Sequence, residues 1–405
     1  MQAKDSAIRI VAVDDNAIWR RAISEIVSGE PDLTLVGAAR DGREAVEMIE
    51  RENPDVVTLD VEMPGMTGHE VLSELKARKL RPRIIMVSST TDSGASATIR
   101  ALALGAVDFV TKPSTSSPRE SIKELREQLL PKVRVLFASM RTVRPSTSAS
   151  SIKMVPATSV GAPTRSTDSG LTSGRRASRD VAGRIGQTAV GSGRSPNDRP
   201  TPTARPLAPA GKPRGVVIGV STGGPAALTR LIPNLPGDFR LPICIVQHMP
   251  PKFTKTMAAD LNRQSELDVV EAEDGMVVEP GRVLIAPGGR HMTIGNSGGR
   301  TIARIDDEDP IEACRPAVEK LFASSAELWG GRQLVVMLTG MGHDGRRGCT
   351  RLHELGAPII CQSPESCVVF GMPSHPVAAG QATSILDLDD IAPDLVRRSL
   401  RQIAA

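Results

Sequence analysis

The feature that most constrains the fold is a regular alternation of short apolar runs with helical patterns along the first part of the chain. Strands are expected at Ile8–Val13, Leu33–Ala38, Val56–Leu59, Arg83–Ser88 and Ala106–Thr111. Helices are expected at Ile18–Val27, Gly42–Arg51, Gly68–Arg78, Ala95–Leu104 and Arg119–Ala138. Successive parallel strands need crossover connections of about a dozen residues or more, usually a helix, and this alternation supplies them. The sequence therefore predicts an α/β domain with a five-stranded parallel sheet and helices on both faces.

The pattern breaks in the next segment, which is rich in Ser, Thr, Pro, Gly and Arg and has no aromatic residue. Between Met140 and Lys212 it carries roughly twelve basic and about three acidic residues. Such a composition cannot bury enough apolar surface to offset the entropy of ordering the chain. We therefore expect an N-terminal domain of residues 1–138, a long disordered linker of residues 139–213 and a C-terminal domain of residues 214–405.

Apolar runs and helical patterns return in the C-terminal domain. Strands are expected at Val216–Val220, Pro242–Gln247, Val269–Ala272, Arg282–Ala286, Thr301–Ile305, Gln333–Thr339 and Pro358–Cys361, and helices notably at Arg315–Leu328 and Ile391–Ile403. This pattern predicts a second α/β domain, Rossmann-like, with mixed strand directions around a hairpin-like middle region.

Charge and composition exclude several classes of protein. The net charge is only +4, and the excess of basic over acidic residues lies in the linker. We therefore expect no nucleic-acid partner. No run of about eighteen apolar residues is present, so no membrane insertion is expected. The short polar segment Met1–Arg9 is unlike a secretory signal, which predicts a cytoplasmic protein. The five cysteines are odd in number and form no close metal-type pair, and Cys361 and Cys367 are interpreted as buried small residues.

Polar side chains gather at the predicted strand ends of the N-terminal domain. Asp14 and Asp15 follow the first strand, Asp60 follows the third, Ser88 ends the fourth and Lys112 follows the fifth. The carboxyl ends of parallel strands share one crevice, where ligands bind. Carboxylates suit Mg²⁺, and a metal, an ammonium and a hydroxyl together can receive a phosphoryl group on Asp60. An Asp-Asp pair alone would equally suit a helix cap.

At these residues the segment Ile8 to Leu136 resembles the receiver domain of two-component response regulators, which implies a flavodoxin-like fold. The resemblance implies that Asp60 is phosphorylated by a histidine kinase and that Lys112 and Ser88 sense the phosphate. It further implies an aromatic switch at Phe109, three residues before Lys112, although Phe109 would equally suit the core. The implied Mg²⁺ ligands are Asp14, Asp15, Asp60 and the backbone carbonyl of Glu62.

A nucleophile is indicated at the start of the C-terminal domain. Gly219, Ser221 and Gly223 have the Gly-x-Ser-x-Gly spacing of a tight turn that exposes a serine above a helix N-terminus. Pro225 suits the first helical turn, and the helix N–H groups can hold an oxyanion. A glycine-rich turn also suits phosphate binding, but the Rossmann fingerprint and the Walker lysine are both missing.

A nucleophilic serine needs a base and an orienting carboxylate. His248 closes an apolar strand, as Ser221 does, whereas the competitors His343 and His375 lie in loop sequence. Asp344 lies in a glycine-rich loop after another strand, where it could also cap the helix that follows. The order Ser, His, Asp excludes the α/β-hydrolase fold, which requires Ser, Asp, His.

The motifs together resemble the catalytic domain of chemotaxis protein-glutamate methylesterases over nearly all of 215–405. They are Gly219-Val-Ser-Thr-Gly-Gly-Pro225, Gln247-His-Met-Pro250, Ala286-Pro-Gly-Gly-Arg-His291, Thr339-Gly-Met-Gly-His-Asp-Gly345 and Gly371-Met-Pro373. The resemblance implies hydrolysis of glutamyl methyl esters and deamidation of glutamines on chemoreceptor helices, without a cofactor in this domain. The backbone N–H of Met341 is the implied oxyanion donor, and helix-end geometry makes Thr222 a second candidate.

Two features depart from that family. The linker is much longer than usual, which predicts weaker autoinhibition by the receiver, because effective concentration falls with tether length. His375 stands beside the Gly-Met-Pro motif without an assigned role. The competing interpretation is a receiver-linked binding module without chemistry, in which the basic linker contacts nucleic acid or membrane.

Overall fold

The computed structural model describes residues 7–114, 117–142 and 211–400. The predicted linker lies mostly outside these residues. The predicted start of the linker at residue 139 is too early, because helix α5 (Pro118–Thr142) includes residues 139–142. No helix-breaking residue interrupts the pattern there.

The N-terminal domain contains the predicted parallel sheet. Its strands are β1 (Ile8–Val13), β2 (Leu33–Ala39), β3 (Val56–Asp60), β4 (Arg83–Ser88) and β5 (Asp108–Thr111). They follow the order β2-β1-β3-β4-β5, and all neighbouring pairs are parallel. The predicted five-stranded parallel sheet is thus confirmed.

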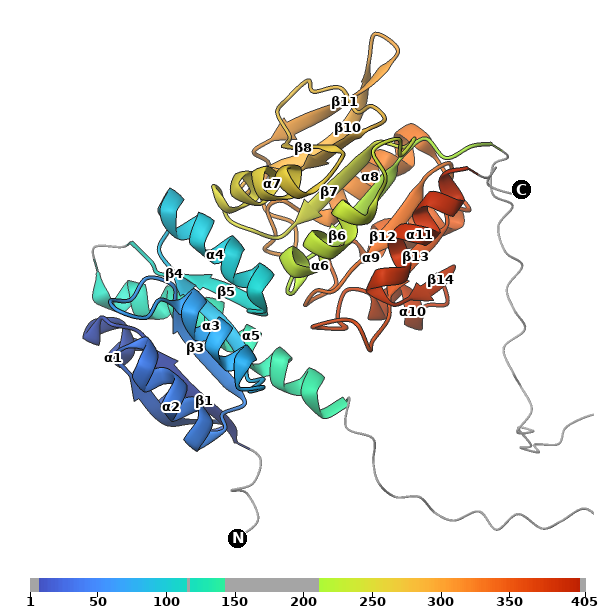
Figure 1. The fold of residues 1–405 in the computed structure, drawn as a ribbon. Helices are drawn as coiled ribbons and strands as arrows, with labels where there is room; N and C mark the ends of the chain where they lie inside the picture. The colour runs from blue at the N-terminus through green and yellow to red at the C-terminus, as the bar shows by residue number, and fades with distance from the viewer. Residues whose placement is uncertain (1–6, 115–116, 143–210, 401–405) are drawn as a thin grey trace, which may run out of the picture. The chain divides into compact units, whose positions relative to one another are not determined.

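Helices cover both faces of this sheet (Figure 1). They are α1 (Ala17–Ser28), α2 (Gly42–Glu52), α3 (Gly68–Ala77), α4 (Asp92–Leu104) and α5. Alternate residues of a strand point to opposite faces. Accordingly, Ile10 packs with α1 and α5, whereas Val11 packs with α2, α3 and α4.

The C-terminal domain is built on a second parallel sheet. Its strands are β6 (Val216–Val220), β7 (Ile243–Gln247), β8 (Asp268–Glu271), β9 (Arg282–Ile285), β12 (Leu334–Met337), β13 (Ile359–Gln362) and β14 (Ser384–Leu386). Their order is β14-β13-β12-β6-β7-β9-β8, with every pair parallel. The antiparallel pairing that we expected inside this sheet occurs instead in a separate hairpin of β10 (His291–Ser297) and β11 (Arg300–Asp306).

The two faces of this second sheet are covered by different elements. One face packs against α6 (Gly224–Leu231), α7 (Phe253–Gln264) and α11 (Leu388–Ser399). The other packs against α8 (Val318–Trp329), α9 (Arg346–Glu354) and the hairpin. The short helices η1 (Ile232–Asn234) and α10 (Ser374–Ala378) complete the domain. Helix α8 begins three residues later than predicted, because Ala317 is its N-cap residue with extended backbone, and Pro316 disfavours helical backbone at Arg315.

Each sheet has a point at which the strand order reverses and the following helices leave toward opposite faces. In the N-terminal domain this point lies between β1 and β3, and in the C-terminal domain between β6 and β12. The loops at such a point separate and leave a crevice at the carboxyl ends of the strands. Both sets of candidate residues lie at these ends.

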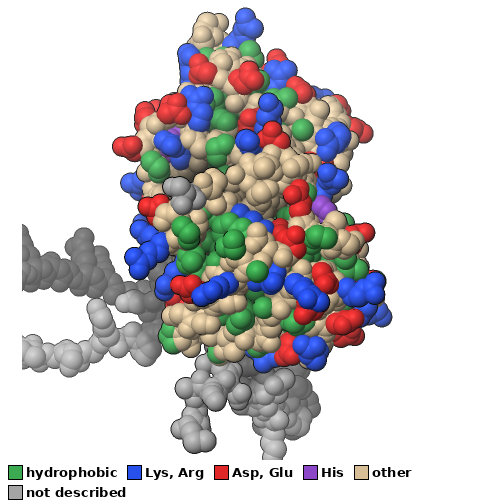
Figure 2. All heavy atoms as spheres, turned by 90° about the vertical axis from the view of Figure 1, so that its left-hand side faces the viewer, with side chains coloured by type: hydrophobic (Ala, Val, Ile, Leu, Met, Phe, Trp, Pro, Cys, Tyr) green, Lys and Arg blue, Asp and Glu red, His purple; other side chains and the backbone are tan. Residues whose placement is uncertain are grey.

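The charges of the described surface are mixed. Figure 2 shows basic and acidic side chains interspersed over the face that it draws. This face therefore lacks the large single-sign field that nucleic-acid-binding surfaces carry. Within the part of the chain that the structure describes, no helix is both long and apolar enough to cross a membrane.

Candidate functional site

Strand register brings Ser221 and His248 side by side. Val220 on β6 pairs with Gln247 on β7, so the residue after each strand lies opposite the other. The backbone N–H of His248 also donates to the carbonyl of Val220, at 3.2 Å. Two residues far apart in the sequence thus meet at adjacent strand ends.

Glycines make the turn after β6 possible. Gly223 is the N-cap residue of α6 and has a φ of 79°, a left-handed conformation that side chains other than glycine rarely adopt. A Cβ on Gly224 would lie 1.9 Å from Oε1 of Gln247. The amide Nε2 of Gln247 donates to the carbonyl of Ser221 at 3.0 Å, which fixes the backbone of the serine.

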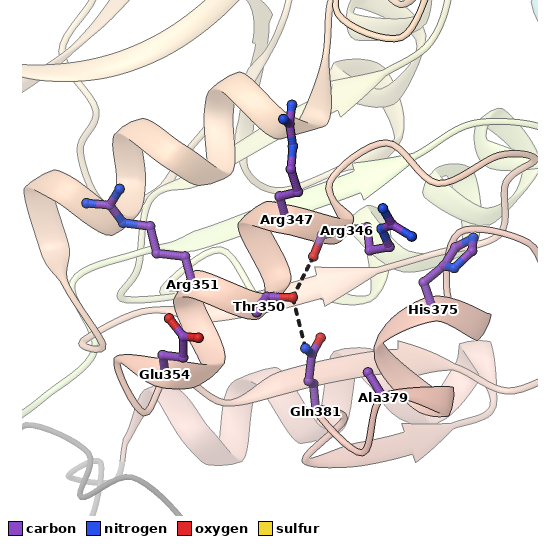
Figure 3. A pocket seen from close by; sticks show the side chains of 8 residues that line it. All are labelled: Arg346, Arg347, Thr350, Arg351, Glu354, His375, Ala379 and Gln381. Atoms are coloured by element: carbon purple, nitrogen blue, oxygen red, sulfur yellow. Dashed lines mark hydrogen bonds between the residues drawn. The ribbon is translucent and has the colours of Figure 1, made fainter.

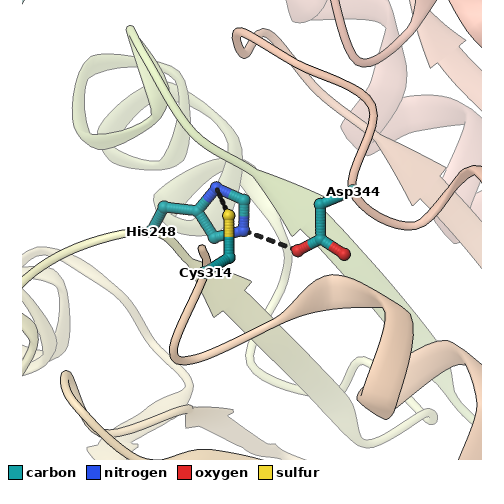
Figure 4. A group of neighbouring side chains, drawn as sticks. All are labelled: His248, Cys314 and Asp344. Atoms are coloured by element: carbon teal, nitrogen blue, oxygen red, sulfur yellow. Dashed lines mark hydrogen bonds and ion pairs between the residues drawn. The ribbon is translucent and has the colours of Figure 1, made fainter. Parts of the chain in front are cut away.

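Asp344 lies directly behind His248. Its Oδ2 is 2.8 Å from Nε2 of His248, and the carboxylate is 4% exposed (Figure 4). Burial opposes ionisation of Asp344, but hydrogen bonds from His248 and from backbone N–H groups hold its pKa below the ordinary value. The carboxylate is therefore ionised and accepts from Nε2–H, which leaves Nδ1 as the basic nitrogen of the ring.

The same carboxylate also caps a helix. The backbone N–H groups of Val318 and Glu319 donate to Asp344, at 2.6 and 2.9 Å. Ala317, the N-cap residue of α8, has no side-chain oxygen to do this. We expected Asp344 to suit the helix that follows it, but that helix, α9, has Gly345 as its N-cap and receives no side-chain cap.

The environment of His248 favours its charged form. Burial lowers the pKa of the imidazole, but hydrogen bonds and charges from Asp344 and Cys314 outweigh burial and raise the pKa to about 9. Cys314 lies against the same ring, with Sγ 3.8 Å from Nδ1, and the thiol, the imidazole and the carboxylate of Asp344 have atoms within 4.8 Å of one another (Figure 4). The thiol therefore contacts the nitrogen that has to accept a proton.

Cys314 is presented by a tight turn. Ile311 and Cys314 exchange two backbone hydrogen bonds, and the residues between them, Glu312 and Ala313, have φ values of 52° and 62°. Such values are uncommon for non-glycine residues and occur where surrounding structure enforces them. Among the cysteines, Cys244, Cys349 and Cys361 are buried, whereas Cys314 and Cys367 are partly exposed.

The loop after β12 closes against the serine. A Cβ on Gly340 would lie 2.8 Å from Cβ of Ser221, so the two backbones approach closely. The hydroxyl of Thr339 donates to the carbonyl of Thr222 at 2.9 Å. No described residue accepts a hydrogen bond from the backbone N–H of Thr222 or Met341, and the hydroxyl of Ser221 has no partner in the same set.

The competing histidines lie elsewhere. Nε2 of His343 is 3.0 Å from Oε2 of Glu312, and the ring of His343 meets that of His375 edge-on at 5.9 Å. His375 lines a surface pocket of about 650 Å³ beside α9. Of the histidines that we weighed for this site, His248 is the one bonded to Asp344.

The acidic residues of the N-terminal domain converge on one lysine. Nζ of Lys112 is 2.7 Å from Oδ2 of Asp60 and 2.8 Å from Oδ2 of Asp14. Carboxylate oxygens of Asp14, Asp15 and Asp60 lie within 4.8 Å of one another. Burial and the neighbouring Asp14 raise the pKa of Asp60 to about 6, despite the hydrogen bond from Lys112. One ammonium thus leaves negative charge uncompensated, and this oxygen set suits a divalent cation.

The remaining predicted residues of this domain lie around that centre. The backbone N–H of Glu62 is 3.5 Å from Oδ1 of Asp60. Ser88 is buried at the end of β4, where its hydroxyl bonds Thr98 at 2.6 Å rather than Asp60. Phe109 is buried on β5, in register with Met86 on β4.

Sequence reasoning missed Cys314, the contact of Gly340 with Ser221, and the capping of α8 by Asp344. All three are contacts between distant segments, and no local spacing signals them. Gln247 could have been inferred, because a polar residue inside an apolar strand next to a candidate base is unusual.

Comparisons with known proteins agree with this organisation. The family model for CheB methylesterase matches residues 216–395, and that for the response regulator receiver domain matches residues 10–126. The protein-glutamate methylesterase/protein-glutamine glutaminase of Symbiobacterium thermophilum is 40% identical, with 96% of each chain covered. The protein of the same name from Thermotoga maritima is 38% identical, covering 97% of this chain and 98% of its own.

Solved structures include the CheB methylesterase catalytic domain of Thermotoga maritima. It is 44% identical, and the match covers 46% of this chain and 98% of that one, with a TM-score of 0.45. The relatives that match over nearly their whole length carry the assignment. The chain belongs to the family of protein-glutamate methylesterases/protein-glutamine glutaminases, with a response regulator receiver domain followed by a CheB methylesterase domain.

Proposed function

We propose that this protein hydrolyses glutamyl methyl esters and deamidates selected glutamines on chemoreceptor helices, under the control of phosphorylation at Asp60. The observation that carries the proposal is the bond of 2.8 Å between His248 and Asp344 beside Ser221, at the reversal point of the second sheet. A nucleophile, a base and an orienting carboxylate are the groups that acyl transfer requires.

The residues then act in sequence. The hydroxyl oxygen of Ser221 attacks the ester carbonyl, and Nδ1 of His248 takes the hydroxyl proton. Asp344 holds Nε2–H and stabilises the imidazolium. The imidazolium returns the proton to the leaving oxygen, and methanol departs from an acyl-enzyme on Ser221. Water, deprotonated by His248, attacks the acyl carbon; the bond to the Ser221 oxygen breaks, the imidazolium returns its proton to that oxygen, and glutamate is released. With a glutamine substrate the leaving group is ammonia, and the later step is the same.

The tetrahedral intermediates carry an oxyanion that needs hydrogen-bond donors. The backbone N–H groups of Met341 and Thr222 suit this role, because no described residue accepts from either; Thr222 follows Ser221, and Met341 follows Gly340, whose backbone approaches Ser221. Loss of one such donor typically costs about a hundredfold or more in rate.

Control is proposed to start at the acidic centre of the receiver domain. A histidine kinase, or a small phosphodonor, phosphorylates Asp60. Mg²⁺, held by Asp14, Asp15, Asp60 and the backbone carbonyl of Glu62, would neutralise the charge of the phosphoryl group. Lys112 pairs with Asp60 and Asp14, so a phosphoryl group on Asp60 would compete for its ammonium. Ser88 and Phe109 are proposed to report the phosphate to the rest of the domain.

The nucleophile is tested with a fluorophosphonate probe, which labels activated serines. Wild-type protein should be labelled at Ser221, and labelling should be lost in Ser221→Ala and strongly reduced in His248→Ala. The control is Ser297→Ala on the exposed end of β10, which should label as wild type. Absence of labelling in wild type would favour the alternative of a binding module without chemistry.

A further inference from the structure

A pocket of about 650 Å³ lies along α9, between that helix and the segment that contains α10 (Figure 3). Three arginines of α9 line it, Arg346, Arg347 and Arg351, together with His375 from α10. Glu354 is the acidic residue of its lining. The pocket is therefore basic, and no step of the proposed mechanism uses it.

The arginines of this pocket are weakly neutralised. Arg347 reaches Glu319 and Arg351 reaches Glu327 at 3.9 Å each, and both guanidinium groups are more than half exposed. Ion pairs of such length that involve exposed arginines contribute little, even where the partner is largely buried, as Glu319 is. Arg346 forms no ion pair with any residue in the described ranges. By contrast, Arg290, in the loop after β9, binds Asp307 through two hydrogen bonds, at 2.7 and 3.0 Å.

The floor of the pocket is polar and held in place. Nε2 of Gln381 donates to Oγ1 of Thr350 at 2.9 Å, and Thr350 donates to the carbonyl of Arg346 at 3.1 Å (Figure 3). Burial, His343 and Arg346 lower the pKa of His375, which favours the neutral imidazole, so the positive charge of the pocket comes from its arginines. The pocket thus offers a fixed polar floor with guanidinium groups on its rim.

Its position connects it to the active site. Helix α9 begins two residues after Asp344, so Arg346 lies at the near end of the pocket. A helix rises about 1.5 Å per residue, which puts Arg351 about 7.5 Å farther along the axis. A ligand that lies in the pocket therefore extends away from the catalytic set along a helix that carries three arginines.

We propose that this pocket docks an acidic segment of the substrate protein and so positions the neighbouring ester or amide at Ser221; this inference rests on the proposed function. Each turnover leaves a carboxylate on the substrate, so a helix with several modifiable glutamates carries negative charges beside the remaining esters. On a helix, glutamates one or two turns from the reacting residue lie about 5–11 Å away, a span comparable to the axial separation of Arg346 and Arg351. Guanidinium–carboxylate pairs supply both charge and geometry.

The test compares two substrates with the full-length protein, in the presence of Mg²⁺ and acetyl phosphate. One is methylated chemoreceptor membranes, followed by methanol release, and the other is a small neutral ester that cannot reach the pocket. The variants are Arg351→Glu, Arg351→Lys and the matched control Arg300→Glu, at an exposed position on the hairpin. Arg351 is chosen because Arg346 lies too close to Asp344 for a clean charge reversal.

The proposal predicts a rise in KM of about tenfold for the receptor substrate in Arg351→Glu, from the loss and reversal of one charge contact. The kcat on receptor and the rate on the small ester should stay as in wild type. Arg351→Lys should retain most of the affinity, and Arg300→Glu should behave as wild type. An unchanged KM in Arg351→Glu, an equal rise in Arg300→Glu, or an equal loss of small-ester rate would overturn the docking role.

A binding assay separates this proposal from the proposed function. A fluorescent glutamate-rich peptide without an ester should bind wild type and bind Arg351→Glu more weakly, whatever the activity. If inorganic phosphate at matched ionic strength displaces the peptide completely, the pocket is a small-anion site and the proposal is wrong. If wild type binds the peptide but releases no methanol from receptors, the proposed function fails and the docking role stands.

Discussion

Replacing Asp344 should lower both activity and stability, because one carboxylate binds His248 and caps the N-terminus of α8. In Asp344→Ala, the N–H groups of Val318 and Glu319 lose their acceptor. Loss of a helix cap costs about 0.5–2 kcal/mol, and a buried unsatisfied donor about 1–3 kcal/mol. We therefore expect a loss of about 2–4 kcal/mol in the free energy of unfolding, together with a fall of about 10⁴-fold in kcat.

The matched comparison is Ser221→Ala. The serine hydroxyl has no partner among the described residues, so its removal should abolish activity and change stability by less than about 0.5 kcal/mol. Asp344→Asn should fall between the two variants in stability, because one amide oxygen can still accept from the helix. Activity in Asp344→Asn should be as low as in Asp344→Ala, because the amide cannot stabilise the imidazolium.

The chain offers a built-in probe for this measurement. Trp329 is the last residue of α8 and is 3% exposed, while the other tryptophan, Trp19, lies in the receiver domain. In a Trp19→Phe background, the fluorescence of Trp329 during urea unfolding reports the methylesterase domain. If Asp344→Ala unfolds at the same urea concentration as Ser221→Ala, the capping role of the carboxylate is refuted.

Three further variants test other contacts of the two sites. Cys314→Ala removes a group that raises the pKa of His248. In wild type, kcat/KM should rise with pH near the His248 pKa of about 9, and in the variant this rise should move to lower pH. An unchanged pH profile of kcat/KM would contradict the contact. Asp60→Asn should stabilise the receiver domain by about 1–2 kcal/mol at neutral pH without Mg²⁺. The folded-state pKa of Asp60 is raised, so the carboxyl destabilises the folded domain as pH rises above the pKa that Asp60 has in the unfolded chain. Thermal unfolding checks this, and lower stability of the variant would count against it. Gly340→Ala puts a Cβ 2.8 Å from Cβ of Ser221 and should displace the serine. The kcat of this variant on a small ester should fall about a hundredfold, and a wild-type kcat would refute the close approach.

The sheets could be predicted because their strands are buried on both faces. Buried parallel strands appear in sequence as short continuous apolar runs, and the end of each run marks the edge where chemistry is placed. This is why the sequence alone places Asp60, Ser221 and His248 at strand ends. The strands that were missed, β10 and β14, are partly exposed and lack such a run.

The contacts that tune the site could not be predicted in the same way. Asp344 lies in a glycine-rich loop, and the local pattern points to the following helix rather than to α8. Cys314 lies in a turn 66 residues away from His248, and its chemistry depends on a separation that no spacing encodes. Such contacts depend on how loops close over the carboxyl edge, which involves backbone conformations that apolar patterning does not describe.

The central claim is that Ser221 performs ester hydrolysis under the control of Asp60. The most direct measurement is methanol release from methylated chemoreceptor membranes by the full-length protein, with and without acetyl phosphate and Mg²⁺. The account predicts release by wild type that increases with acetyl phosphate, release by Asp60→Ala that does not respond, and no release by Ser221→Ala. Release by Ser221→Ala at the wild-type rate, or an equal response to acetyl phosphate in Asp60→Ala, would contradict it.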